Sequence, residues 1–250
     1  MFRLVEDRGV INRLGFNNGG LAAAKERLGH REPGGIVGIN VGANKDSADR
    51  IADYVSGVSE MAPLADYLTI NISSPNTPGL RALQDRGALD ELLSSVSEAR
   101  GPSGPPMFLK VAPDLERAEV DDVARVAMDR RIDALIVSNT TVSRPDLTSK
   151  HRGQAGGLSG APLKALALER LRDFRGATGG AMPLIGAGGI CDGADALARI
   201  RAGASLVQLY SALAYSGPGI ARRICRDLKR LLQMQGFRNV EEAIGTEGRS

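Results

Sequence analysis

Tryptophan is absent from this 250-residue chain, which contains only four tyrosines and five phenylalanines. Proteins that bind single-stranded nucleic acid usually stack bases on aromatic side chains, so this scarcity argues against such a partner. The net charge is only +3, and no basic block is interleaved with aromatic residues. The chain therefore lacks the electrostatic footprint of a nucleic-acid-binding protein, and we expect no nucleic-acid partner.

Cysteine and histidine are equally scarce. Cys191 and Cys225 lie far apart in the chain, and His30 and His151 lie in polar, loop-like sequence. This pattern fits neither a zinc site nor a disulfide framework, and it favours a reducing, intracellular environment. We therefore expect no metal centre and no Ser-His-Asp catalytic triad. No run of 18 apolar residues occurs, so we expect no membrane-spanning helix.

Short apolar runs rich in valine and isoleucine alternate with longer amphipathic stretches along the whole chain. The predicted strands are Ile36–Asn40, Asp66–Asn71, Met107–Val111, Ala134–Ser138, Pro183–Ala187 and Ser205–Tyr210. Apolar residues at three- and four-residue steps predict helices over Asp46–Met61, Glu116–Arg131, Ala194–Ala202 and Gly219–Gln235. Strands alternating with helices in this way indicate βαβ units and a parallel sheet.

Six strand–helix units are compatible with two α/β architectures. An open doubly wound sheet is complete with six strands, whereas a closed (β/α)₈ TIM barrel needs eight. No linker divides the sequence, because Arg100–Pro106 is only a connector before the third predicted strand. We expect residues 1–250 to form a single domain.

Polar side chains follow two of the predicted strands at the point where each strand ends. The first group is Asn71–Asn76, and the second is Ser138–Thr141. One such run alone is typical of an ordinary turn. Two runs at strand ends indicate one site assembled from several loops, because α/β folds bind ligands at that edge. Amide side chains both donate and accept hydrogen bonds, which suits a flat, polar ligand.

Glycine-rich segments and a lysine in an apolar strand suggest where an anion could bind. Gly186–Gly189 joins a strand to a helix that opens at Asp192, an arrangement that favours phosphate, although a simple tight turn explains the glycines as well. In barrels, phosphate binds at the loops after the seventh and eighth strands. The predicted strands Pro183–Ala187 and Ser205–Tyr210 are the last two of this chain, so their loops are the corresponding ones. Lys110 either snorkels to the surface or points into the barrel mouth. Gly156–Gly160 is expected to be another flexible loop, before a helix beginning near Pro162.

These motifs, taken together and in order, carry a family resemblance that covers nearly the whole chain. They are Asn12–Phe16, Gly38–Gly42, Asn71–Asn76, Lys110–Asp114, Ser138–Thr141, Gly156–Gly160, Gly186–Gly189 and Ser205–Tyr210. The chain resembles the quinone-dependent class (class 2) of dihydroorotate dehydrogenase. The resemblance implies a (β/α)₈ barrel with bound FMN that oxidises dihydroorotate to orotate in de novo pyrimidine (UMP) biosynthesis and passes electrons to a membrane quinone.

The resemblance also assigns roles to individual residues. It makes Ser74 the catalytic base, and a serine rather than a cysteine at this position indicates the quinone-linked class. Implied substrate-binding residues are Asn12, Arg13, Leu14, Gly15, Phe16, Asn71, Asn76, Asn139 and Thr140. Implied FMN-binding residues are Asn40, Asn71, Lys110, Ser138, Gly160, Gly189, Tyr210 and Ser211. Ser138 and Ser211 stand where the family usually has threonine, and both keep the hydroxyl. Thr77 and Phe16 resemble residues that shape a proton exit.

The N-terminus is where the chain departs from the family pattern. The resemblance implies about a hundred further residues before Met1, against roughly 250 residues for a whole barrel. That segment would hold a membrane-binding helical extension, two barrel strands, a flavin loop and a substrate-binding lysine. We therefore expect an N-terminally truncated barrel with about six of its eight βα units. A complete member is expected on the cytoplasmic side of the inner membrane, peripherally bound through that segment alone, whereas this chain by itself is expected to be cytoplasmic.

Other interpretations of the same residues remain open at this point. The chain could be an inactive or flavin-free barrel fragment that keeps the motifs without the chemistry. It could instead be a phosphate-binding barrel lyase or isomerase that uses the glycine loops without flavin. Such a protein would be colourless and would use an acid or a lysine at a strand end as its base.

Overall fold

Six parallel strands form the main sheet in the computed structural model, which describes residues 1–32, 34–77 and 79–248. They are β3 (Gly38–Val41), β4 (Tyr67–Asn71), β5 (Met107–Val111), β6 (Ala134–Val137), β8 (Leu184–Ala187) and β9 (Ala204–Gln208). All six strands predicted from the sequence are confirmed, with small differences at their ends. Ile36 is not part of β3 and lies exposed, and the last predicted strand ends before Tyr210.

The order of the strands distinguishes a doubly wound sheet from a (β/α)₈ barrel. Each strand pairs with the next unit in chain order, β3-β4-β5-β6-β8-β9, and every pair is parallel. A doubly wound sheet would reverse its order at a switch point. None of the described strands does so, and β3 and β9 each have one partner among them. The sheet is therefore an open arc of a (β/α)₈ barrel with six βα units, and the doubly wound alternative is wrong.

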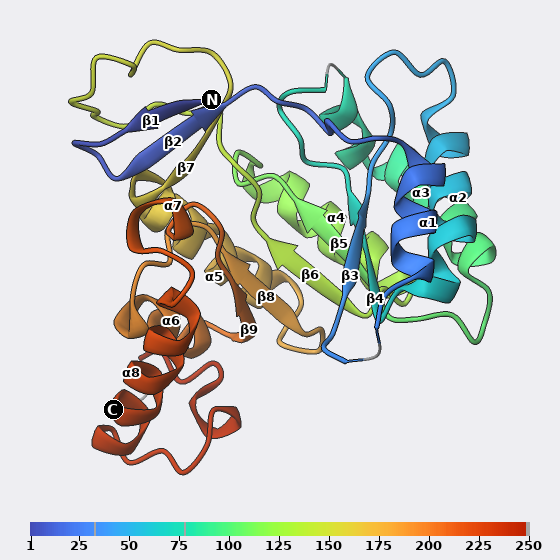
Figure 1. The fold of residues 1–250 in the computed structure, drawn as a ribbon. Coiled ribbons are helices and arrows are strands. Elements are labelled where there is room, and N and C mark those ends of the chain that lie inside the picture. The colour runs from blue at the N-terminus through green and yellow to red at the C-terminus, as the bar shows by residue number, and fades with distance from the viewer. Residues whose placement is uncertain (33, 78, 249–250) are drawn as a thin grey trace.

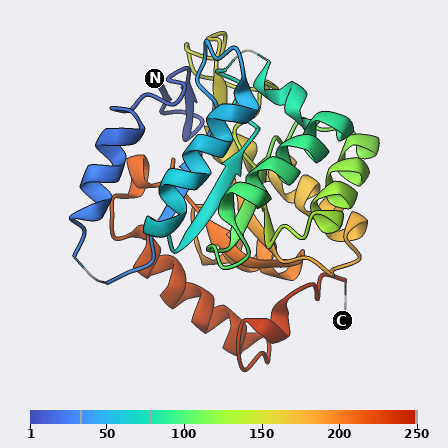
Figure 2. The ribbon, with the colours of Figure 1, turned by 90° about the vertical axis from the view of Figure 1, so that its right-hand side faces the viewer.

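Helices cover the outer face of this arc. They are α1 (Leu21–Gly29), α2 (Arg50–Met61), α3 (Arg86–Arg100), α4 (Arg117–Asp129), α5 (Lys164–Ala177), α6 (Gly193–Arg201) and α8 (Ile220–Met234). The short helix α7 (Leu213–Ser216) lies instead at the mouth of the arc. Short 3₁₀ turns lie at Ala62–Leu64, Leu80–Gln84, Ala161–Leu163 and Glu241–Ala243. Successive long helices pack side by side from α2 round to α8, as Figures 1 and 2 show. No helix of the described residues has the length and apolar character needed to cross a membrane.

Helix starts follow local capping chemistry. The carboxylates of Asp49, Asp85 and Asp192 accept hydrogen bonds from free backbone amides at the starts of α2, α3 and α6. Glu116 and Glu119 form a reciprocal capping box at the start of α4. The four predicted helices are confirmed to within a turn. Neither α1 nor α3 was predicted from the sequence, although α3 buries residues at helical spacing, from Leu89 to Val96.

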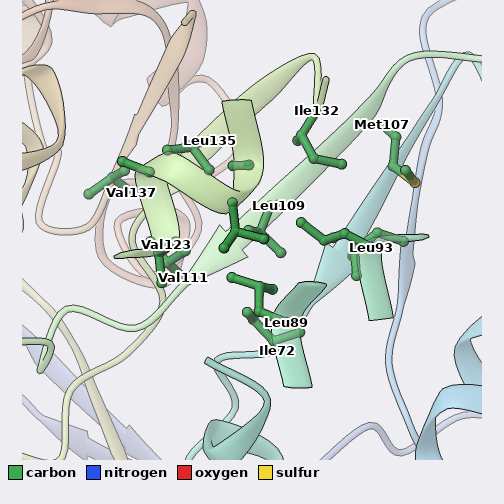
Figure 3. Close-up of a cluster of buried hydrophobic side chains, with 14 of the residues drawn as sticks. Ile72, Leu89, Leu93, Met107, Leu109, Val111, Val123, Ile132, Leu135 and Val137 are labelled. Carbon is green, nitrogen blue, oxygen red and sulfur yellow. The ribbon is translucent and has the colours of Figure 1, made fainter. Parts of the chain in front are cut away.

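The core lies between the helices and the outward-facing side of the sheet. Along β5, Met107, Leu109 and Val111 are buried against the helices, whereas Phe108 and Lys110 alternate onto the inner face. Figure 3 shows Leu109 surrounded by apolar side chains from neighbouring strands and helices. This alternation places Lys110 inside the arc rather than on the helix-covered side.

A second, smaller sheet lies beside the mouth of the arc. It is antiparallel, in the order β1 (Phe2–Leu4), β2 (Gly9–Asn12) and β7 (Gly157–Gly160), and is seen at the upper left of Figure 1. The expectation of a flexible loop at Gly156–Gly160 is therefore wrong. These residues form a strand because their partner, Gly9–Asn12, comes from the other end of the chain. The Tyr215 hydroxyl donates to the Leu4 and Gly9 carbonyls and ties this sheet to α7.

The complete burial of Leu109 predicts that a cavity at this position destabilises the fold. Leu109→Ala should lower the free energy of unfolding by about 2–5 kcal/mol, because Leu109 is 0% exposed and its surroundings can collapse only partly. Leu206→Ala is the matched control, and since Leu206 is 61% exposed its effect should stay within about 0.5 kcal/mol. Urea unfolding followed by circular dichroism would measure both. Similar losses for the two variants would contradict this description of the core.

Candidate active site

The carboxyl ends of the six strands meet at one rim, and a pocket of about 650 Å³ opens there. This volume suits a cofactor or small ligand. Predicted site residues that line it are Asn12, Leu14, Gly15, Lys110, Ser138, Asn139, Thr140, Gly160, Gly189, Tyr210 and Ser211. They come from both sheets and from loops throughout the chain. The predicted residues that do not line it are Arg13, Phe16, Asn40, Asn71, Ser74 and Asn76.

Asn71 links the two polar clusters that the sequence predicted. Its Nδ2 donates to Asn40 Oδ1 at 3.1 Å, and its Oδ1 accepts from Ser73 Oγ at 2.8 Å. Asn139 Nδ2 lies 3.4 Å from the same Oδ1 and donates to Ser73 Oγ at 3.0 Å. The ends of β3, β4 and β6 are thereby joined through side-chain amides. This network orients Asn139, which lines the pocket.

Ser74 lies deep in the loop after β4. It is 6% exposed, and its Oγ accepts a hydrogen bond from the Asn76 amide at 3.3 Å. Asn76 in turn donates from Nδ2 to Asn12 Oδ1 at 3.2 Å, which attaches the loop to β2. Thr77, at the end of the same loop, is also buried. The hydroxyl of Ser74 is therefore held in a water-poor environment close to the rim.

Arg13 and Phe16 are two of the four predicted substrate residues that do not line the pocket. Arg13 Nη1 donates to Gln154 Oε1 at 3.2 Å, and its guanidinium stacks over the Phe2 ring. Phe16 packs so closely on Gly42 that a Cβ there would lie 2.6 Å from the Phe16 ring. Both residues thus have structural partners in this conformation.

Arg81 was not predicted from the sequence, yet it ties together three of the strand-end loops. It donates from Nε to the Ser73 carbonyl at 3.2 Å, from Nη2 to the Thr140 carbonyl at 3.1 Å and from Nη1 to Asp114 Oδ2 at 2.8 Å. Asp114 also accepts from Thr141 Oγ1. One guanidinium therefore fixes the loops after β4, β5 and β6 relative to one another. A lone arginine after an asparagine-rich loop gave no sequence signal for these partners.

Lys110 presents an amine on the inner face of the arc. Burial lowers its pKa from the ordinary value, and no charged or hydrogen-bonding partner within the described residues offsets this effect. A desolvated cation without a partner is unfavourable. An anionic or electron-rich ligand in the pocket would supply the missing partner, and this orphaned amine fits a flavin that gains electrons.

The glycine loop forms another part of the pocket wall. Gly189 has φ +73°, and a Cβ there would lie 2.5 Å from the Lys164 Cα, so only glycine fits. Ser211 Oγ donates to Ser159 Oγ at 2.7 Å, whereas the Tyr210 side chain is 85% exposed. Cys191 also lines the pocket, and burial raises the pKa of its thiol. That direction disfavours a reactive thiolate.

The fold and the site together define an α/β-barrel protein with a ligand-sized pocket at the carboxyl ends of its strands, lined in part by amide, hydroxyl and glycine residues. A family model described as dihydroorotate dehydrogenase matches residues 1–232. The chain belongs to the dihydroorotate dehydrogenase family, whose members are oxidoreductases, and this membership implies a flavin cofactor.

Individual relatives agree with this assignment. A protein from Erythrobacter litoralis named dihydroorotate dehydrogenase (quinone) is 65% identical over 248 residues, covering 99% of this chain and 72% of its own length. A protein of the same name from Novosphingobium aromaticivorans is 61% identical, with the same coverage. A crystal structure of DHODH from Eimeria tenella in complex with ferulenol superposes with a TM-score of 0.94 at 39% identity, covering 100% of this chain and 74% of that one.

The Arg81–Asp114 pair generates a prediction about coupling. A double-mutant cycle with Arg81→Met and Asp114→Asn should give an interaction free energy of about 1–3 kcal/mol, because the two side chains are only 23% and 15% exposed. The control cycle, Arg117→Met with Asp121→Asn, removes a pair that is 61% and 45% exposed. It should give less than about 0.5 kcal/mol. The two interaction free energies are measured by denaturant unfolding. Equal values in both cycles would contradict the proposal that Arg81 fixes the strand-end loops through Asp114.

The lowered pKa of Lys110 predicts a pH dependence of stability. Below the folded-state pKa the amine is protonated in both states, so its contribution is constant. Between that pKa and 10.5 the unfolded chain binds more protons, so the free energy of unfolding rises with pH. Flavin-free wild type should therefore gain stability relative to Lys110→Met as pH increases toward 10.5. The prediction would be refuted if the difference in free energy of unfolding between the two proteins stayed constant across this pH range.

Proposed function

We propose that this chain oxidises dihydroorotate to orotate with bound FMN and passes the electrons to a membrane quinone, in de novo pyrimidine biosynthesis. One observation carries the proposal: the chain is 65% identical, along 99% of its length, to a protein named dihydroorotate dehydrogenase (quinone). Ser74 at the predicted base position fits the quinone-linked class. Residues 1–250 are proposed to be the FMN-binding barrel domain, and contact with the membrane is proposed to be peripheral.

The proposed substrate site is the amide-rich side of the rim. Asn139 and Thr140 line the pocket, Asn139 Nδ2 reaches Asn71 Oδ1, and Asn76 donates to Asn12, another lining residue. Amides that donate and accept suit the ring of a dihydropyrimidine, whose own edges alternate donors and acceptors. Asn12 closes this side from the small sheet, and Leu14 and Gly15 of the adjoining segment line the pocket beside it. Arg13 and Phe16 would approach the substrate only if this segment moved.

The proposed cofactor site is the other side of the rim. Asn40, Asn71, Lys110 and Ser138 would surround the flavin ring, and Gly160, Gly189, Tyr210 and Ser211 would hold its ribityl phosphate. Given its exposed side chain, Tyr210 would contribute through its backbone. When bound, FMN would accept the hydride that leaves C6 of dihydroorotate. Lys110 would stabilise negative charge there as a fixed cation.

Ser74 is proposed to take the proton from C5 of the substrate. A serine hydroxyl is a weak base unless its own proton can leave, so its surroundings matter. In the structure Ser74 is buried in a loop that Asn76 attaches to β2 and Arg81 fixes at Ser73. These contacts position the hydroxyl and restrict water, and buried Thr77 is the proposed next residue along a proton exit.

The test separates cofactor binding from proton abstraction. Ser74→Ala should retain flavin but reduce the rate of flavin bleaching by dihydroorotate about a hundredfold to ten-thousandfold, the usual cost of losing a general base. Ser74→Cys should keep partial activity. Stopped-flow absorbance would measure the rate, and Ser95→Ala, at a half-buried serine of α3 outside the site, is the control. A near-normal rate of flavin bleaching in Ser74→Ala would contradict the assignment of Ser74 as the base. A protein that never binds FMN would contradict the proposed function itself.

A further inference from the structure

Arg199 is a buried arginine that the proposed mechanism does not use. It lies on α6, behind the glycine loop, and is 1% exposed. Its Nη2 donates to the Gly188 carbonyl at 2.7 Å and to the Lys164 carbonyl at 2.8 Å. Both acceptors are backbone oxygens, and no ion pair reaches this guanidinium within the part of the chain that the structure describes. Arg199 therefore joins the glycine loop to the start of α5.

The charge of Arg199 remains largely uncompensated. Burial lowers its pKa to about 10, and the carboxylate of Asp195 only partly opposes that effect. Asp195 itself is committed elsewhere, since it pairs with Lys164 Nζ at 2.7 Å and accepts from the Cys191 amide at 2.9 Å. The guanidinium is therefore still protonated at neutral pH. A buried cation without an anion beside it is unfavourable, and an anion bound at the adjacent loop would offset this cost.

The hydrogen bond from Arg199 also sets the direction of a peptide group. The Gly188 carbonyl and the Gly189 amide belong to one planar trans peptide, so they point to opposite sides. With the carbonyl directed at Arg199, the amide is directed away from α6, toward the pocket that Gly189 lines. This amide donates to no other described residue. Arg199 thus holds a free backbone donor toward the ligand and places positive charge behind it.

We propose that Arg199 is a positioning residue that makes this pocket selective for a phosphorylated flavin over the same flavin without phosphate. It does not touch the ligand. It acts by fixing and polarising the Gly188–Gly189 peptide, and its charge favours a phosphate at the loop over an uncharged hydroxyl. This inference rests on the proposed function, because it assumes that the pocket binds FMN.

The experiment compares FMN with riboflavin, which differs only by lacking the phosphate. Apoprotein of the full chain is titrated with each flavin, and quenching of flavin fluorescence gives the two Kd values. Arg199→Gln should lower the riboflavin-to-FMN ratio of Kd values by about tenfold or more, the scale of one charge-assisted hydrogen bond. The Kd for riboflavin itself should stay within about threefold of wild type, since the ring site is untouched.

Two further variants protect the test against misfolding. Arg199→Met carries the same prediction as Arg199→Gln, and a buried charge replaced by an apolar side chain of similar length is often tolerated. Arg199→Lys keeps the charge and should restore most of the preference for FMN. The matched control is Arg201→Gln, because Arg201 lies on the same helix but donates to Gln235 Oε1 and the Thr246 carbonyl, away from the loop.

The outcomes separate this inference from the proposed function. A neutral Arg199 variant that loses affinity for both flavins equally shows a merely structural role and overturns the inference. An unchanged ratio overturns it as well. If wild-type protein binds neither flavin, the proposed function fails instead. The inference about Arg199 is supported if the neutral variants selectively lose affinity for FMN, Arg199→Lys recovers it and Arg201→Gln leaves it unchanged.

Discussion

The parallel pairing of neighbouring strands in chain order is the constraint on which the rest of the structure depends. It places Asn71 opposite Lys110 and Lys110 opposite Ile136 in register, so residues from successive units lie side by side. Every carboxyl end is brought to one rim, and every crossover helix is brought to the outside. The inner face holds Lys110 beside a small apolar cluster that includes Phe108 and Ile136, while the other side of the strands packs on helices.

Polar contacts rather than apolar packing hold the rim itself. Loops leaving parallel strands carry carbonyl groups that no neighbouring strand can satisfy, and these need donors. Arg81 supplies two such donors, to the Ser73 and Thr140 carbonyls, and a third to the Asp114 carboxylate. Its planar fork suits this task better than a lysine would, because the donors point in fixed and different directions. The loops that carry Ser74 and Asn139 are thereby held in position.

Positive charge is distributed at both ends of the proposed flavin site. Lys110 lies at the ring end and Arg199 behind the phosphate end, and burial lowers the pKa of each. Neither side chain forms an ion pair with a carboxylate of the described residues. Such an arrangement costs stability in the empty protein and favours an anionic ligand when one binds, which is the usual compromise at a functional site. In both cases the binding energy of the cofactor would be coupled to the stability of the fold.

The sequence by itself determined the six βα units, the strand boundaries to within a few residues, and the polar runs at the strand ends. These features depend on local apolar periodicity and on motifs, which a linear sequence displays directly. Tertiary structure alone decided that Gly157–Gly160 is a strand, because its partner Gly9–Asn12 lies at the opposite end of the chain. It also decided the roles of Arg81 and Arg199. Apart from the Asp114 carboxylate, which pairs with Arg81, their acceptors are backbone carbonyls, as many as 59 residues away in the chain for Arg81 and 35 for Arg199. A backbone carbonyl has no side-chain signature that a sequence pattern could reveal.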